Sequence, residues 1–392
     1  MSKNLHLEHL EDEILNKGTR GGLEAVKALR DVTQILSGAG GNKFTITTKF
    51  DGIAILTGID PEDGRFFVSK KGNNPKLVKS EADAYNYHQG GLAKKLAESF
   101  RYLSTIEIKG VLQGDLMFTD DKKEETIKNK KYITFRANTI TYAVEPHTEL
   151  GKKIKKAKMG VVFHTTYTGN SVPNMTATFG VKKSAYKTND SVWVDNAEFK
   201  DVSGTAGFSN IEKDKFTKML NMAEGSLKQT KGFLDKIQSG KKPLQFDTEF
   251  KKFFNSYVKQ GRPVPSVATA YRDFYYHMGR EYGKNIDKVK TLKSQANKAG
   301  KFIDAVDFLK DNERGVKMLI ASYMNLQGAK NMIVDKMKKV RSMNLFVDMG
   351  NGDYKVTDDE GFVFIKIGGT SAVKLVDRLE FSKLNFLIPK VW

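Results

Sequence analysis

Between residues 44 and 202, short apolar runs rich in β-branched and aromatic residues follow one another, separated by Gly, Asp and Asn. Examples are KFTITTKF, IAILTGID, GVLQGDLMF and MGVVFHTTYTG, and DPEDGRFF has the composition of a hairpin turn. Runs of this length and composition are typical of strands. They restrict the chain to a fold built on an antiparallel sheet, which one helical pattern interrupts near residues 81–103.

Helical patterns flank this β-rich region on both sides. Residues 1 to about 40 and 210–344 place apolar residues three and four positions apart, and the strand pattern returns near residue 346. We therefore predict an α+β protein with four parts. They are an N-terminal helical segment (1–43), the first part of a β-rich domain (44–204), a large all-α insertion (205–345) and the closing strands of the domain (346–392).

The charge of the chain is strongly positive, at +19 over 392 residues. It is also unevenly placed, because residues 251–344 hold 20 Lys and Arg against 8 Asp and Glu. A basic region of this kind favours polyanions, and nucleic acid is the commonest polyanion inside cells. A lysine-rich composition that serves only solubility is the alternative, but it would spread the charge more evenly.

The composition also excludes several classes of protein. There is no cysteine, so disulfides, thiolate metal sites and cysteine nucleophiles are absent. No apolar run reaches the roughly 18 residues of a membrane helix, and the charged N-terminus does not resemble a signal peptide. We expect no membrane association and a monomeric, cytoplasmic protein.

One tetrapeptide, KFDG at residues 49–52, suggests a catalytic lysine. A lysine amine attacks a phosphorus atom when the amine is deprotonated and correctly aimed, and a nearby acid orients the lysine or a metal ion. The motif alone is weak, because Lys-x-Asp-Gly often arises by chance at the end of a strand. Its interpretation therefore depends on the motifs in the remainder of the chain.

KFDG resembles the first motif of the covalent nucleotidyltransferases, which include ATP-dependent DNA ligases, RNA ligases and messenger-RNA capping enzymes. Five further segments resemble the later motifs of that superfamily in the same order, namely VSKKGN, VLQGDLMF, GVVFHTTY, DEGFVFIK and SAVKLVDR. The chain departs from the pattern where Lys70 replaces an arginine, Asp115 replaces a glutamate and Lys366 lies one residue late. Through HLEHLED, FRANTITYAV and HTTYTG it also resembles tailed-phage proteins, and a phage-encoded protein of this kind would be located in the host cytoplasm.

The resemblance implies an adenylation domain with ATP and Mg²⁺ as cofactors, and it implies roles for the matched residues. Lys49 would be the catalytic nucleophile, and Glu360 and Asp115 would hold the metal ion. The implied nucleotide-binding residues are Asp51, Gly52, Lys70, Asp115, Phe163, Lys366 and Lys374, with Asp115 at the ribose, Phe163 stacked on the base and Lys374 near the α-phosphate.

The helical insertion supplies candidates for nucleic-acid contact. Its basic residues neutralise phosphates, whereas its aromatic residues, spaced three or four apart, are better explained as core. The candidates are Lys251, Lys252, Lys259, Arg262, Arg272, Arg280, Lys284 and Lys288.

Together these features predict an ATP-dependent DNA ligase that seals nicks between a 5′-phosphate and a 3′-hydroxyl through a lysine adenylate. The expected partner is nicked duplex DNA or a DNA/RNA hybrid. RNA ligase is the nearest alternative, with a capping guanylyltransferase behind it. A nucleic-acid-binding phage protein that kept the fold but lost catalysis is the alternative outside enzymes.

Overall fold

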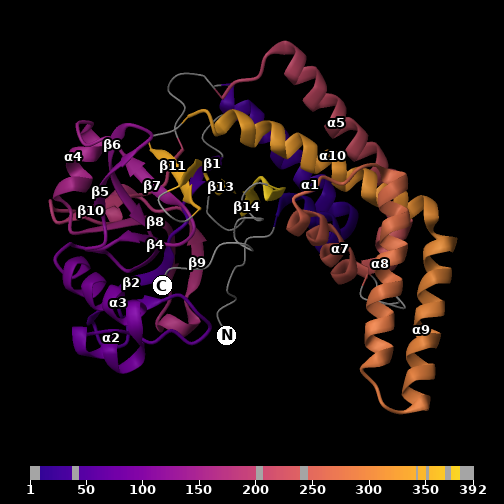
Figure 1. Ribbon diagram of the computed structural model, residues 1–392, viewed down its shortest axis with the longest axis horizontal. Helices are drawn as coiled ribbons and strands as arrows, with labels where there is room; N and C mark the ends of the chain where they lie inside the picture. The colour runs from indigo at the N-terminus through magenta and orange to yellow at the C-terminus, as the bar shows by residue number, and fades with distance from the viewer. Residues whose placement is uncertain are drawn as a thin grey trace.

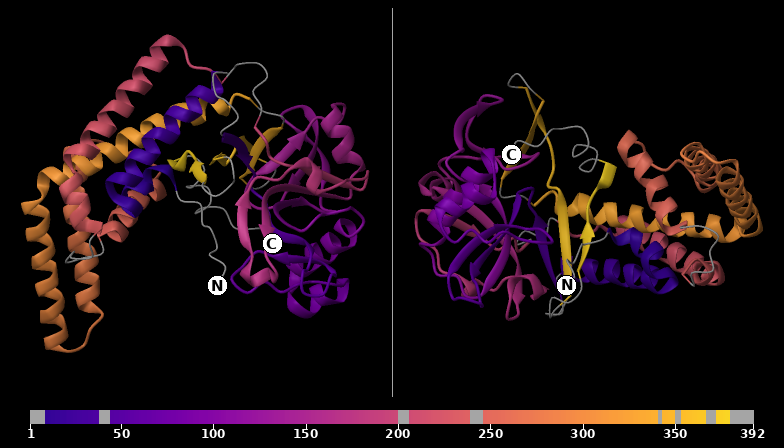
Figure 2. Two further views of the ribbon diagram at one scale, coloured as in Figure 1. Left: turned by 180° about the vertical axis from the view of Figure 1, so that it is seen from behind. Right: turned by 90° about the horizontal axis from the view of Figure 1, so that it is seen from below.

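The computed structural model describes residues 9–37, 44–199, 206–238, 246–340, 343–349, 353–366 and 372–379. Within these ranges the protein is mixed α+β, and its strands form sheets whose neighbours are antiparallel except for one parallel pair, β8 and β10. Figures 1 and 2 show the strands gathered on one side of the molecule and the long helices on the other. The predicted fold class is confirmed at this level.

Three sheets make up the β body. A six-stranded sheet has the order β10-β8-β4-β2-β3 with β9 added on β8, a five-stranded sheet has the order β12-β11-β7-β6-β5, and a three-stranded sheet has the order β1-β13-β14. The strands are β1 (Phe44–Lys49), β2 (Ile53–Ile59), β3 (Phe66–Lys70), β4 (Val111–Phe118), β5 (Lys123–Ile127), β6 (Lys130–Arg136), β7 (Thr141–Val144), β8 (Met159–Thr168), β9 (Thr176–Phe179), β10 (Val192–Asp195), β11 (Asn344–Asp348), β12 (Tyr354–Val356), β13 (Gly361–Lys366) and β14 (Ala372–Leu375). Two of the sheets thus combine strands from before and after the long helices.

The helices divide between the two bodies. The β body carries α2 (Glu81–Tyr87), α3 (Gly90–Leu103) and α4 (Glu149–Lys156), with short 3-10 turns at η2 (Val172–Asn174) and η3 (Lys183–Ala185). The helical body contains η1 (Leu10–Asp12), α1 (Glu13–Leu36), α5 (Asn210–Gln229), α6 (Lys231–Gln238), α7 (Phe246–Gln260), α8 (Val267–Asp287), α9 (Leu292–Asp311) and α10 (Glu313–Met337).

The N-terminal helix α1 belongs to the helical body. Its buried apolar face, which includes Ile14 and Leu29, shares one core with α5, α6, α7 and α10. The helix bends at Gly18, whose φ of 62° lies in the left-handed region that glycine tolerates. Residues 13–36 therefore serve packing of the helical body and do not form a separate segment.

The three-stranded sheet is the wall between the two bodies. Because side chains alternate along a strand, one of its faces packs into the core of the helical body and the other faces the β body. The residues on the helical side include Ile46, Phe362, Phe364 and Leu375. The opposite face carries Thr47, Lys49, Val363, Ile365 and Lys374, which line a pocket. The helical body thus supports one side of that pocket.

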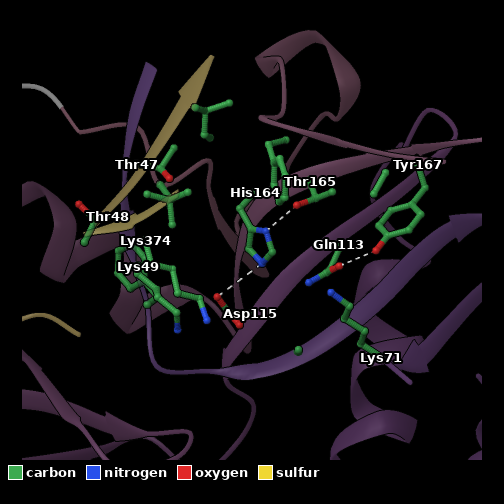
Figure 3. Close-up of a pocket in the computed structure, with 17 residues that line it drawn as sticks. Thr47, Thr48, Lys49, Lys71, Gln113, Asp115, His164, Thr165, Tyr167 and Lys374 are labelled. Carbon is green, nitrogen blue, oxygen red and sulfur yellow. Dashed lines mark hydrogen bonds and ion pairs between the residues drawn. The ribbon is translucent and has the colours of Figure 1, made fainter. Parts of the chain in front are cut away.

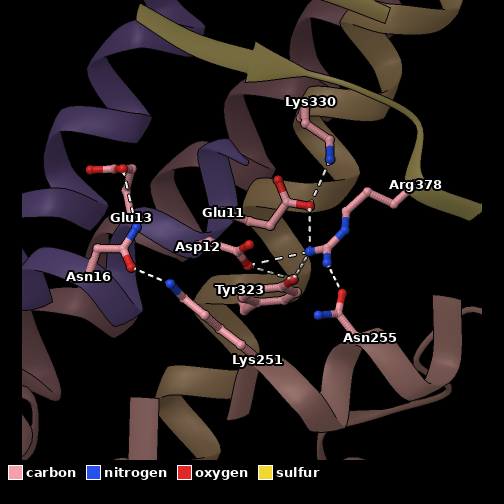
Figure 4. A network of polar contacts seen from close by, with 9 residues as sticks. All are labelled: Glu11, Asp12, Glu13, Asn16, Lys251, Asn255, Tyr323, Lys330 and Arg378. Carbon is pink, nitrogen blue, oxygen red and sulfur yellow. Dashed lines mark hydrogen bonds and ion pairs between the residues drawn. The ribbon is translucent and has the colours of Figure 1, made fainter. Parts of the chain in front are cut away.

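A buried polar network fastens the wall to the helices (Figure 4). Arg378, just after β14, donates to Asp12 at 3.3 Å and to the Tyr323 hydroxyl of α10 at 2.8 Å. Beside it, Lys330 of α10 pairs with Glu11 at 2.7 Å, and both side chains are fully buried. Charges at this depth are tolerated only when they are paired, so the network fixes how these segments meet.

Candidate functional site

A pocket of about 210 Å³ lies between the three-stranded wall and strands β4, β8 and β9. Figure 3 shows Lys49 and Lys374 reaching in from the wall, Lys71 reaching in from the other side, and Asp115 between them. The lining residues are Thr47, Thr48, Lys49, Phe50, Ala54, Lys71, Gln113, Asp115, His164, Thr165, Tyr167, Ala177, Phe179, Ala197, Val363, Ile365 and Lys374.

Lys49 ends β1 and forms an ion pair with Glu360. The sheet register explains the contact, because Lys49 lies opposite Gly361 on β13. Gly361 has a φ of 148°, and a Cβ there would lie 2.5 Å from the carbonyl oxygen of Leu375, so only glycine fits next to Glu360. The Glu-Gly pair of the sequence thus places a carboxylate on the Lys49 amine.

The surrounding carboxylates control the ionisation of Lys49. Burial alone would lower the pKa of the amine, but Glu360 and Asp115 together raise it above that of an ordinary lysine. For Glu360, burial raises the pKa although Lys49 opposes the shift. In the free protein Lys49 is therefore an ammonium group, and it must lose a proton before it can act as a nucleophile.

Asp115, in the middle of β4, is the most perturbed carboxyl group of the pocket. Burial raises its pKa to about 7, which nearby Glu360 favours and Lys49 opposes. His164 of β8 approaches it, with 3.7 Å between Nε2 and Oδ2, while its Nδ1 lies 2.8 Å from the Thr165 hydroxyl. Burial and the nearby Lys71 lower the pKa of His164 to about 3, so this imidazole is neutral near pH 7.

The pocket as a whole is suited to an anion. Lys71 directly follows β3, and burial lowers the pKa of its amine. Lys374 of β14 lines the same space as Lys49. Lys49, Lys71 and Lys374 thus line one small, partly buried pocket, where charge interactions are stronger than in bulk water. A phosphate chain bound here would contact cations from two sides.

Asp51 has a different role from the one that the sequence suggested. Its carboxylate accepts hydrogen bonds from Asn138 Nδ2 at 2.7 Å and from the backbone amides of Thr139 and Ile140 at 2.6 and 2.8 Å. These donors leave the carboxylate little capacity for a nucleotide or a metal ion. Asp51 is not among the residues that line the pocket, and the contact that the structure shows for its carboxylate is with the 138–140 turn.

Gly52 allows the backbone after Lys49 to lie close to β4. A Cβ at this position would lie 2.6 Å from Cβ of Asp115 and 2.9 Å from the carbonyl oxygen of Leu116. The glycine therefore lets the turn after Lys49 lie directly against β4. Its predicted importance for the site has a packing explanation, and no direct contact with a nucleotide is required.

Two predicted nucleotide-binding residues lie one position away from the pocket. Phe163 is fully buried and packs against Tyr186 on the other face of the sheet, so it cannot stack on a base in the pocket. Lys70 is not among the lining residues, whereas its neighbour Lys71 is. In both cases the next residue along the chain, His164 or Lys71, lines the pocket instead. Side chains alternate along a strand, and a register shift between β4 and β8 next to His164 lets both His164 and Thr165 line the pocket.

Several pocket residues were missed by the sequence argument. Tyr167 donates to Gln113 Oε1 at 2.8 Å, and Phe179 of β9 supplies an aromatic surface. The sequence could have indicated two of them, because residues two positions apart on a strand share a face. Gln113 lies two positions from Asp115, and Tyr167 lies two positions from Thr165. Lys366, the remaining nucleotide-binding candidate, is the last residue of β13, and its side chain lies outside what the structure describes.

No group of three or more His, Asp or Glu side chains suited to a metal ion occurs among the described residues. Glu360 forms an ion pair with Lys49, and Asp115 lines the same pocket as Lys49 and helps to raise its pKa. Mg²⁺ is commonly held by one or two carboxylates together with substrate phosphates and water. The donor set therefore fits a magnesium ion that arrives with a nucleotide, and it does not fit one held by the protein alone.

The basic residues predicted to contact nucleic acid differ in their availability. Lys251 is half-buried and donates to Asn16 of α1 at 2.5 Å, so it is less available for contact with a nucleic acid than the exposed candidates. The other seven are exposed, and they are Lys252, Lys259, Arg262, Arg272, Arg280, Lys284 and Lys288. Polar partners on the surface include Glu249 for Lys252, Gln260 for Arg262, Asp273 for Arg272 and Glu281 for Lys284.

Residues 4–390 match the model of a family described as "Family of unknown function (DUF6267)". The chain belongs to this family. No curated protein and no solved structure matches it. Among the described residues, no helix is long and apolar enough to cross a membrane.

Proposed function

We propose that this protein is an ATP-dependent polynucleotide ligase in which Lys49 carries the adenylate. The observation that carries the proposal is the placement of Lys49, whose amine is ion-paired with Glu360 inside a pocket that also contains Asp115, Lys71 and Lys374. A lysine that served only as a solvated residue at a strand end would not be expected in a pocket with these charged groups. The order of the six sequence motifs supports the same chemistry.

In the first step, the Lys49 ammonium group releases a proton to solvent, and the neutral amine attacks the α-phosphorus of ATP. A nitrogen–phosphorus bond forms, the bond to the pyrophosphate oxygen breaks, and pyrophosphate leaves. Lys71 and Lys374 offset the negative charge of the phosphates, and Asp51 keeps Lys49 aimed by holding the turn behind it. The adenylate then passes to a 5′-phosphate, and a 3′-hydroxyl displaces AMP to join the strands.

Glu360 and Asp115 would hold Mg²⁺ when a nucleotide is bound. The ion would neutralise phosphate charge and compete with Lys49 for both carboxylates. Since these carboxylates raise the pKa of Lys49, engaging them elsewhere favours the neutral amine that the reaction needs. The ion pair of the free protein is thus compatible with a nucleophile that becomes active on substrate binding.

The charge of the helical body supports a nucleic-acid substrate. The chain carries a net charge of +19, and the excess of Lys and Arg is concentrated within residues 251–344. Basic side chains supply the sequence-independent part of nucleic-acid affinity. We propose nicked duplex DNA, or a DNA/RNA hybrid, as the partner of the adenylated protein.

The test is sealing of a nicked duplex whose 5′-phosphate strand is labelled, in the presence of ATP and Mg²⁺. We expect joined product with the wild type and with Lys70→Ala, and none with Lys49→Ala. Nicks with RNA on either side give the strand preference. No joining of any nicked or single-stranded substrate by the wild type would contradict the proposal. If such a protein still bound duplex, it would fit a nucleic-acid-binding function without catalysis.

A further inference from the structure

The hairpin of α8 and α9 extends away from the rest of the molecule, and Figures 1 and 2 show its turn at the far end from the β body. Near the base, Ala305 and Leu309 enter the core of the helical body. Farther out, Tyr282 and Phe302 pack on each other with 5.3 Å between ring centroids. We call residues 284–293 the hairpin tip.

The hairpin tip is strongly basic. It contains Lys284, Lys288, Lys290 and Lys293 against one acid, Asp287. Lys284 is paired with Glu281, but Lys288, Lys290 and Lys293 are exposed and make no ion pair with any residue in the described part of the chain. Three exposed cations thus gather on a short turn, which favours contact with a polyanion.

The same tip exposes a large apolar side chain. Leu292, the first residue of α9, has 84% of its surface exposed. The local backbone is ordered by its own hydrogen bonds, since Thr291 caps Ser294 N at 3.3 Å and Gln295 donates to the carbonyl of Val289 at 3.0 Å. The fold therefore presents a leucine to solvent between lysines, at a cost that contact with a partner would recover.

We propose that the hairpin tip is a nucleic-acid contact in which Lys288, Lys290 and Lys293 bind backbone phosphates and Leu292 packs against a sugar in the minor groove. Lysine at phosphate with an apolar side chain inserted into the groove is a recurrent way to bind duplexes without reading sequence. Anionic membranes also attract lysines, but membrane-binding helices need a wide apolar face. Within residues 284–293, Leu292 is the one large apolar side chain that is exposed, and the exposed Tyr276 and Ile303 lie farther along α8 and α9.

This inference rests on the proposed polynucleotide substrate but not on catalysis, so it is tested by binding. Fluorescence anisotropy with a labelled nicked duplex, over a range of salt, compares the full-length wild type with three variants. They are the triple change Lys288→Ala, Lys290→Ala and Lys293→Ala, the single change Leu292→Ser, and a matched triple change of exposed lysines in the β body, Lys130→Ala, Lys131→Ala and Lys153→Ala.

Each lost phosphate contact reduces the dependence of log affinity on log salt by about 0.9. We expect the tip triple variant to lose a slope of about 2 to 3 and Leu292→Ser to weaken binding about tenfold with its slope unchanged. The matched triple variant should bind nearly as the wild type does. Equal losses in the two triple variants, or unchanged binding by both tip variants, would overturn the inference.

Two further readouts separate this inference from the proposed function. Adenylylation of Lys49 by ATP should be the same in the tip variants as in the wild type, because the pocket is intact. If the wild type is not adenylylated but its DNA binding depends on the hairpin tip, only the proposed ligase function is contradicted. Binding of the tip to vesicles with anionic lipid, and not to duplex, would overturn the inference and leave the function standing.

Discussion

Lys70 and Lys71 are adjacent lysines of which only Lys71 lines the pocket. If Lys71 binds a phosphate, Lys71→Ala removes a charge-assisted contact and should raise the KM for ATP about 10- to 100-fold. Lys70→Ala should leave that KM within about threefold of the wild-type value, because the altered side chain lies outside the pocket. Adenylylation rates measured against ATP concentration give both values. Equal effects of the two substitutions would show that the pocket does not hold the phosphates.

The ionisation of Asp115 should make the stability of the protein depend on pH. Burial raises its pKa to about 7 in the folded state, above its ordinary value of 3.8, so the native protein holds a proton there that the unfolded chain has released. Stability from this group is therefore present below about pH 4 and is lost as pH rises towards 7.

The substitution Asp115→Asn removes this titration. In the absence of nucleotide we expect the variant to gain several degrees in Tm relative to wild type at pH 8, and to show a much smaller gain at pH 5. Thermal unfolding at the two pH values checks the difference. A gain that is the same at both would mean that the Asp115 carboxyl is not buried as described.

At the level of elements, one face of the three-stranded wall packs into the helical core and the other lines the pocket. Phe364 is 4% exposed and packs into the helical core, whereas its neighbour Val363 faces the pocket. Phe364→Ala should lower the free energy of unfolding by about 3–5 kcal/mol, and Val363→Ala by about 1–2 kcal/mol.

Val363→Ala should in addition raise the KM for ATP, since it removes part of the pocket lining. Urea unfolding and adenylylation kinetics on the same two preparations check both statements. The division of faces would be wrong if Val363→Ala were the more destabilising of the two.

The wall also shows how far sequence reasoning reaches. The motifs placed Lys49 at the end of a strand and Glu360 just before one, and the structure brings the two together. Which face a strand residue takes depends on register with its neighbours, which a single sequence does not reveal. The stacking residue Phe163 was consequently assigned to the wrong face, and the inward-facing His164 was passed over.

Asp51 illustrates a second limit. An acid next to the nucleophile suggests a ligand, but its partners are the amides of a turn 88 and 89 residues away. Hydrogen bonds to groups this distant in sequence follow from the tertiary fold. The role of the turn at Asn138 in binding the Asp51 carboxylate is therefore visible only in the structure.

At the scale of the whole molecule, the network around Glu11 holds the helical body to the wall. Burial would raise the pKa of Glu11, but Lys330 and Arg378 bring it down to about 2. Stability from this carboxylate is therefore present above about pH 4.5 and is lost as pH falls towards 2. The contact joins residues 319 positions apart, so the sequence offered no sign of it.

Substituting only one member of the Glu11–Lys330 pair should lower the free energy of unfolding strongly, whereas substituting both with apolar residues should lower it little. Lys330→Met leaves Glu11 with one cation fewer in a dry site and should lower the free energy of unfolding by about 3–5 kcal/mol. The double variant Glu11→Met and Lys330→Met should recover most of the loss, because Arg378 keeps Asp12 as its partner. Urea unfolding of the three proteins checks this. A double variant no more stable than Lys330→Met would contradict the network as described.

The central claim is that Lys49 forms a covalent adenylate, and intact mass spectrometry tests it most directly. The purified protein is first treated with pyrophosphate to remove any bound adenylate, and then incubated with ATP and Mg²⁺. We predict a gain of roughly 329 Da, the mass of one adenylate, in the wild type and in Lys70→Ala, and no gain in Lys49→Ala. Peptide mapping should place the added mass on Lys49. No gain in the wild type with either ATP or GTP would contradict the account.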